Sequence, residues 1–245
     1  MGPARAGAIS LPARVFDTRR FLRTNVKREQ IELWQDIVRE YSPRNLTRYE
    51  DRLPAIAGIA GHLKAVWDDE YLAGMWRKTL IYQLGWFLKS PGRNLGSPYR
   101  APSWSWVSSE GEVRFEDIVK PDALLIGAKV EPRFKAAPMG QVKNGRLSLL
   151  AAVFDNETLG RRISIHGSVY ISTYIDKEGE VGTGTLSYLL LGYGHNVLCG
   201  RWAVALILTE VTGNTFKRIG IMKVGLSCGD FWLAEKRGKK IITLV

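Results

Sequence analysis

The sequence predicts an α+β fold, in which a small N-terminal helical bundle precedes an antiparallel β-sandwich or open β-barrel. Up to about residue 90, apolar residues recur at spacings of three and four, as on one face of a helix. From Tyr99 onward the pattern changes to short β-rich runs that are separated by turn residues. The chain has 245 residues, of which 45% are hydrophobic, so it is long enough to bury one large core or two modest ones.

Three helices are expected in the first part, over about residues 28–41, 53–67 and 68–87, because each range carries one apolar stripe. Asp51 stands just before the second helix, where a carboxylate is expected to cap the free main-chain amides. The acidic run Asp68-Asp-Glu70 is expected to complement the N-terminal dipole of the third helix.

The second part is expected to be built from strands. Eight runs rich in β-branched and aromatic residues follow one another, at 113–115, 123–130, 145–154, 163–175, 186–191, 202–211, 216–224 and 240–245. Two of the intervening pairs, Asn144-Gly145 and Gly213-Asn214, consist of residues that accept a positive φ, and they are predicted to be turns.

These patterns divide the chain into a flexible basic leader at 1–25, a helical subdomain at 26–98 and a β-rich domain at 99–245. The net charge is +11, but residues 1–28 hold seven basic residues against one acidic residue, so most of the excess lies near the leader. A nucleic-acid surface usually interleaves basic and aromatic side chains along one element. Nucleic acid is therefore not expected as a partner, and binding through the leader would show a steep salt dependence.

The composition predicts a cytoplasmic protein that does not enter a membrane. No apolar stretch reaches the roughly 20 residues that span a bilayer, and the first ten residues have no apolar core of the length of a secretory signal. The two cysteines, Cys199 and Cys228, lie far apart without a Cys-x-x-Cys spacing, as is usual where thiols stay reduced.

A search for catalytic patterns leads to the expectation of no enzyme, no metal and no cofactor. The three histidines, His62, His166 and His195, are far apart in sequence, and the glycine-rich segments lack the spacing of a phosphate-binding loop. The alternative is a ligand-binding or enzymatic β-domain whose pocket lies within residues 110–245. A deep pocket with converging polar groups would favour that alternative.

A series of segments in a fixed order carries a family resemblance. They are Trp34–Ser42, Asp51–Ala60, Tyr71-Leu-Ala-Gly-Met-Trp76, Leu84-Gly-Trp86, Tyr99-Arg-Ala-Pro-Ser-Trp-Ser-Trp106, Phe216-Lys-Arg-Ile-Gly220 and Ile241-Ile-Thr-Leu-Val245. Together they resemble the region that follows the HET domain in fungal heterokaryon-incompatibility proteins. The Trp-Ser-Trp pattern after Pro-Ser is the most distinctive of them.

The resemblance implies a non-catalytic accessory or regulatory region, which acts in fungal non-self recognition and cell-death signalling by contacting a protein partner such as a HET signalling domain. The HET domain itself carries a Gly-Tyr-x-Trp-Gly motif that this chain lacks, so no activity of that domain is assigned to residues here. The matching residues are expected to be structural; they are Asp51, Arg52, Trp76, Arg100, Pro102, Ser103, Trp104 and Trp106.

Trp104 and Trp106 are expected at alternate positions of a strand, with both indoles on one face at the junction of the two parts. Arg100 is expected to stack on an indole or to pair with a carboxylate such as that of Asp51. The alternative role is functional, in which exposed indoles beside an arginine grip a partner or a sugar.

Overall fold

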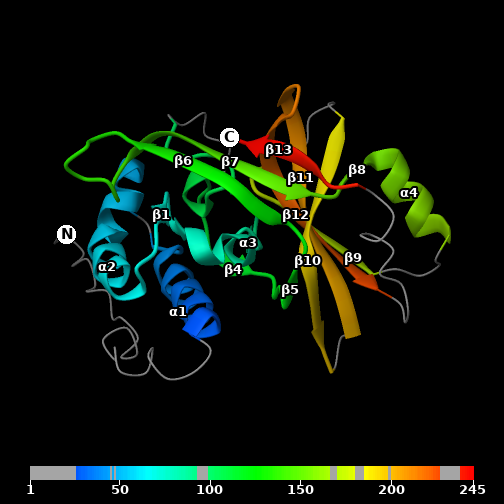
Figure 1. The fold of residues 1–245 in the computed structure, drawn as a ribbon, viewed down its shortest axis with the longest axis horizontal. Helices are drawn as coiled ribbons and strands as arrows, with labels where there is room; N and C mark the ends of the chain where they lie inside the picture. Colours follow the sequence, from blue (N-terminus) through cyan, green and yellow to red (C-terminus); the bar gives the residue numbers. More distant parts are fainter. Residues whose placement is uncertain are drawn as a thin grey trace, which may run out of the picture.

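The computed structural model describes residues 26–44, 46, 48–92, 99–165, 170–179, 185–197, 200–226 and 238–245. Figure 1 shows helices α1 and α2 on one side of the molecule and a large curved sheet on the other. The α+β class is therefore confirmed, with a helical N-terminal part followed by strands. The predicted leader at 1–25 lies outside the described residues.

The first two predicted helices are present as α1 (Val26–Tyr41) and α2 (Arg52–Trp67). Each buries most of the apolar stripe that predicted it; in α1, Trp34, Ile37, Val38 and Tyr41 are buried, whereas Ile31 is half-buried. Asp51 stands at the N-cap of α2, but its side chain makes no capping hydrogen bond. The expected carboxylate cap is therefore wrong.

The third predicted helix is wrong. The chain instead forms a hairpin of β1 (Tyr71–Leu72) and β2 (Met75–Trp76), a 3-10 turn η4 (Arg77–Thr79), a single turn α3 (Leu80–Gln83) and strand β3 (Trp86–Leu88). Ala73 and Gly74 connect β1 to β2 with φ values of 46° and 97°. A right-handed helix cannot pass through that left-handed turn.

The acidic run before this hairpin also has a different role from the expected one. Asp68 ends α2 with a φ of 47°. The carboxylate of Asp69 accepts the main-chain N–H groups of Glu70 at 2.7 Å and Lys78 at 3.1 Å. It thereby closes the loop around the hairpin instead of facing the start of a helix.

The sheet of nine strands carries the second part of the fold. Its strands are β5 (Lys120–Pro121), β6 (Leu124–Pro132), β7 (Val142–Ala151), β8 (Val153–Asp155), β9 (Ile171–Ile175), β10 (Leu186–Asn196), β11 (Gly200–Thr212), β12 (Thr215–Leu226) and β13 (Lys240–Leu244). Their order is β5-β10-β11-β12-β13-β7-β6, with β8 beside β10 and β9 beside β12. Each pairing is antiparallel except β12 with β13.

The sheet is barrel-like and nearly closed. Strand β8 follows β7 after Ala152, and it pairs with β10 at the far side of the sheet order. β7 itself pairs with β13. The nearly continuous segment β7–β8 therefore contacts β13 at one end of the β10-β11-β12-β13 series and β10 at the other end, which nearly closes the barrel. A separate two-stranded sheet pairs β3 with β4 (Val113–Phe115).

Two predictions inside the sheet are corrected. Asn144-Gly145 is not a turn but lies within β7, where a Cβ on Gly145 would come 2.5 Å from Pro102 Cγ and 3.1 Å from Trp104 Cζ2. The glycine thus permits close packing. The predicted strand at 163–175 begins instead with the end of α4 (Asn156–Ile165), and only β9 follows the expectation.

The other turn pair, Gly213-Asn214, is confirmed as the connection between β11 and β12, with a φ of 54° at Gly213. The apolar run from Trp202 to Leu208 in β11 is buried throughout, which requires cover on both faces of the strand. One face contributes to a large core cluster that includes the helical part, and the other contributes to a smaller cluster that includes Leu159 of α4.

Candidate functional site at the helix–sheet junction

The β1–β2 turn is the point at which several resemblance segments meet. The indole N–H of Trp34 donates to the main-chain oxygen of Gly74 at 3.0 Å, and the indole N–H of Trp106 donates to the same oxygen at 2.7 Å. Trp76, in β2, packs edge-on against Trp34 with ring centroids 5.5 Å apart. Three segments that are separated in sequence therefore hold one turn.

The segment Pro102–Trp106 is not a strand, so the alternate-position geometry expected for its two indoles is wrong. Ser105 begins the 3-10 helix η5 (Trp106–Ser108), because its hydroxyl accepts the N–H of Val107 at 3.2 Å. The same hydroxyl donates to the main-chain oxygen of Ala73 at 2.6 Å. Both indoles are fully buried, so neither is exposed to grip a partner or a sugar.

Ser103 joins this segment to the end of the described chain. Its N–H donates to the main-chain oxygen of Val245 at 3.1 Å, and its hydroxyl donates to that oxygen as well. The hydroxyl also accepts the main-chain N–H of Arg218 at 2.9 Å. This one serine thereby links three of the resemblance segments, namely Tyr99–Trp106, Phe216–Gly220 and Ile241–Val245.

Arg218 is buried at the centre of the same junction, and its role was not predicted from the sequence. Its Nε donates to Asp176 at 2.9 Å and its Nη1 donates to the main-chain oxygen of Leu84 at 2.8 Å. Its Nη2 donates to the oxygen of Trp86, and the guanidinium lies 3.5 Å above the centre of the Trp86 ring. The available signal was an arginine inside a strand that is otherwise largely apolar, but nothing in the sequence pointed to Asp176 as its partner.

Arg100 pairs with a carboxylate as expected, but with Glu110, at 2.6 Å, and not with Asp51. The cation that lies near an indole is Arg52, whose guanidinium carbon is 5.4 Å from the centre of the Trp106 ring. The two arginines therefore flank the same aromatic junction in different ways.

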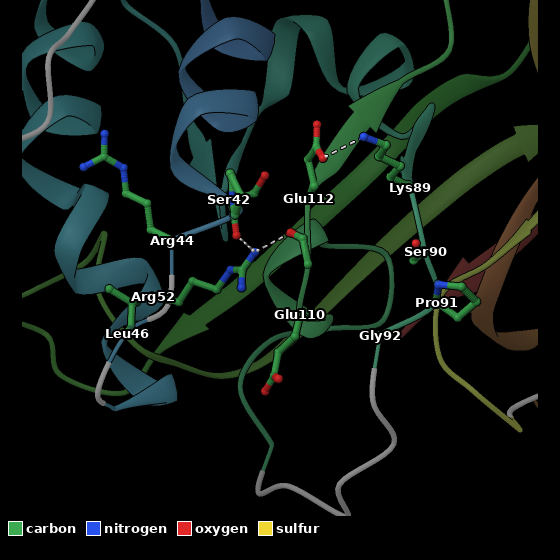
Figure 2. Close-up of a pocket in the computed structure, with 12 residues that line it drawn as sticks. Ser42, Arg44, Leu46, Arg52, Lys89, Ser90, Pro91, Gly92, Glu110 and Glu112 are labelled. Carbon is green, nitrogen blue, oxygen red and sulfur yellow. Dashed lines mark hydrogen bonds and ion pairs between the residues drawn. The ribbon is translucent and has the colours of Figure 1, made fainter.

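A cavity of about 500 Å³ opens beside this junction (Figure 2). Ser42 and Arg44, which follow α1, form one wall with Arg52 at the start of α2, and the opposite wall contains Lys89, Glu110 and Glu112. The cavity thus lies where the helical part, the end of β3 and the start of β4 come together.

Arg52 is the most deeply buried charged group in this lining, with 6% of its surface exposed. Its Nη2 donates to the main-chain oxygens of Ser42 at 3.2 Å and Gly111 at 3.5 Å, whereas its Nε is buried without an acceptor among the described residues. Burial lowers the pKa of the Arg52 guanidinium to about 10, so the group stays charged at neutral pH.

The two carboxylates of the lining are already engaged by other cations. Glu110 holds Arg100, and Glu112 lies 3.6 Å from Lys89 and also binds Arg114. The hydrogen bond from Arg114, reinforced by the charge of Lys89, lowers the pKa of Glu112 below its usual value. Neither carboxylate therefore serves as the direct partner of Arg52.

The candidate metal and catalytic residues do not form a second site in the part of the chain that the structure describes. No group of three or more His, Cys, Asp or Glu side chains there is arranged to hold a metal ion. His62 lies in α2 and His195 in β10, while His166, Cys199 and Cys228 lie outside the described residues. Across the described ranges, no helix is both long and apolar enough to cross a membrane.

No protein-family model matches this sequence, and neither the curated proteins nor the solved structures give a match to it.

Proposed function

We propose that this chain is the non-catalytic accessory region of a heterokaryon-incompatibility protein, which acts in the cytoplasm through contact with a protein partner. One observation carries the proposal: the segments that resemble that family converge on one buried, hydrogen-bonded junction. They include the turn before Trp76, Trp86, the Pro102–Trp106 segment, Arg218 and Val245. A chance set of matching segments has no reason to meet in space.

The chemistry of these residues supports a framework and not a reaction. The indole N–H groups of Trp34, Trp86 and Trp106 each donate to a main-chain oxygen, and the Ser103 hydroxyl lies between two main-chain groups. A nucleophile or general base must instead reach a substrate. The signature residues thus fix the shape of a surface, and the partner that we propose for it is a HET signalling domain.

A co-expression experiment in a filamentous fungus tests this function. The chain is expressed alone, with a HET signalling domain of the same species, and with that domain plus a variant chain that carries Trp104→Ala. We expect the chain alone to leave growth unchanged and to co-purify with the HET domain. The Trp104→Ala chain, which loses a fully buried side chain of the junction, is expected to lose that association.

Two outcomes would contradict the accessory role. Growth arrest by the chain alone would show that it signals without a HET domain. Failure of the folded wild-type chain to co-purify with any HET domain of its species would remove the proposed partner. A circular-dichroism spectrum of each purified chain separates loss of association from loss of the fold.

A further inference from the structure

Arg52 has more hydrogen-bond donors than the protein uses. A guanidinium carries five N–H groups in a planar fork, and in Arg52 the hydrogen bonds to described residues all come from Nη2. The buried Nε has no acceptor there, and no hydrogen bond joins Nη1 to the described part of the chain. Nε is also shielded from solvent, so Nη1 is the donor that remains for an oxyanion in the cavity.

Among the described residues, no carboxylate forms a direct ion pair with Arg52. Of the two carboxylates in the cavity lining, Glu110 is bound to Arg100 at 2.6 Å, and Glu112 is bound to Lys89 and Arg114. A buried charge is normally paired, because removal of the ion from water is costly. An anion inside the cavity would supply the missing countercharge.

A second cation stands across the cavity from Arg52. Figure 2 shows Lys89 entering from the opposite side, with Glu112 between the two cations. The Lys89 side chain is 68% exposed, and its ammonium lies 3.6 Å from Glu112, a spacing typical of a weak surface pair. Lys89 is therefore able to exchange that pairing for a ligand anion at small cost.

The dimensions of the cavity indicate the kind of anion. A volume of about 500 Å³ lies within the range of small-molecule sites, which is roughly 300–1,000 Å³. Its lining also includes the apolar surfaces of Pro43, Leu46 and Pro91, which suit an uncharged organic portion. The lining holds three cations, Arg44, Arg52 and Lys89, and its two carboxylates, Glu110 and Glu112, are paired with Arg100 and Arg114. This excess of positive charge favours a dianionic group over a carboxylate with a single charge.

We propose that the Arg52 cavity binds the phosphoryl group of a small molecule, with Nη1 of the charged Arg52 guanidinium as the main anchor and Lys89 as a second contact. The source of the phosphoryl group is an organic phosphate or the free phosphate ion. This site does not depend on the accessory role, because it rests on the cavity and its charges alone.

Isothermal titration at constant ionic strength tests the site with inorganic phosphate, adenosine 5′-monophosphate and adenosine. We expect both phosphates to bind the wild-type chain and adenosine not to bind. Tighter binding of the nucleotide than of inorganic phosphate identifies an organic phosphate as the ligand. Equal affinities identify the free ion.

Matched arginine variants locate the binding. Arg52→Lys keeps the charge but removes the Nη1 donor, and we expect it to weaken phosphate binding about tenfold. Arg133→Lys, the same change at an exposed arginine outside the cavity, is expected to leave binding unchanged. Lys89→Met changes an exposed side chain and is expected to weaken binding about threefold without disturbing the fold.

Three results would overturn the proposal. The first is phosphate binding to the wild-type chain no stronger than that of chloride. The second is equal phosphate affinity in Arg52→Lys and Arg133→Lys. If Arg52→Lys does not fold, unchanged affinity in Lys89→Met is the third.

Discussion

Two buried arginines, Arg218 and Arg52, show how differently one residue type is used within this junction. The guanidinium of Arg218 meets Asp176, two main-chain oxygens and the face of Trp86. Burial lowers its pKa, and the carboxylate of Asp176 opposes that shift. Arg52 has carbonyl partners and an aromatic neighbour, but no carboxylate of the described residues is bound to it. We therefore assign Arg218 to the framework and Arg52 to the cavity.

Removal of the carboxylate partner of Arg218 tests the first assignment. Asp176→Ala leaves a fully buried guanidinium without its counter-ion, and we expect the free energy of unfolding to fall by about 3–5 kcal/mol. Urea denaturation at neutral pH gives the measurement.

The matched control for Asp176→Ala is Glu131→Ala, which removes the carboxylate of an exposed pair with Lys143. We expect this change to leave the free energy of unfolding almost unchanged, since water and salt screen exposed charges. Equal costs for Asp176→Ala and Glu131→Ala would contradict the framework role of Arg218.

At the scale of elements, hydrophobic periodicity correctly predicted the long helices α1 and α2. It failed where a left-handed turn interrupts an apolar stripe. The stripes of α1 and α2 are repeated over sixteen residues each, so they are recognisable without any knowledge of the partners. The stripe after Trp67 looked equally helical, but the left-handed conformation at Ala73 and Gly74 interrupts it. Hydrophobic spacing does not report the handedness of a turn.

Gly145 shows that a local sequence pattern can also predict a turn where there is none. The Asn144-Gly145 pair predicts a turn, because Asn-Gly is common in hairpins. Its place in β7 is explained instead by Pro102 and Trp104, which pack so closely that a Cβ at Gly145 would overlap the proline ring. That contact joins positions more than forty residues apart in sequence, so no local pattern contains it.

A pair of Gly→Ala changes tests the special role of the β1–β2 turn. At Gly74, with a φ of 97°, a Cβ would lie 2.9 Å from the indole nitrogen of Trp106 and 3.0 Å from Val107 Cγ2. We expect Gly74→Ala to lower the free energy of unfolding by more than 1 kcal/mol, because it combines backbone strain with overpacking.

The control for Gly74→Ala is Gly58→Ala, within helix α2. A Cβ there meets no atom within 4 Å, and alanine favours a helix over glycine by about 0.5–1 kcal/mol. The midpoint temperature of thermal unfolding should therefore fall in Gly74→Ala and rise in Gly58→Ala. A shift of the same sign and size in both would contradict the account of the turn.

At the candidate site, the sequence identified several residues of the junction but not the contacts between them. The structure places Arg52, Trp76, Arg100 and Pro102–Trp106 around the junction, but most of their contacts were not predicted from the sequence. Asp176 stands 42 residues before Arg218, and neither position belongs to a recognisable motif with the other. The cavity itself depends on three elements that meet only in the folded chain.

At the scale of the whole molecule, the helical and sheet parts share one large core cluster. It runs from Trp34 in α1 through Trp104 to Leu206 in β11 and Leu244 in β13. Figure 1 shows β6 and β7 reaching from the sheet toward α2, and a Cβ at Gly61 of α2 would lie 3.9 Å from the Met139 sulfur between those strands. The division into domains at residues 98 and 99 stays a prediction, because a shared core does not establish where one folding unit ends.

The central claim is that the resemblance segments join both parts into one framework, and equilibrium thermal unfolding tests it most directly. Tryptophan fluorescence reports mainly on the helical part and the junction, while the β-strand component of the infrared amide I band reports on the sheet. We expect the two signals to change together, with one midpoint, as in a cooperative two-state transition. Two separate midpoints would contradict the claim, since the sheet would then stand without the junction.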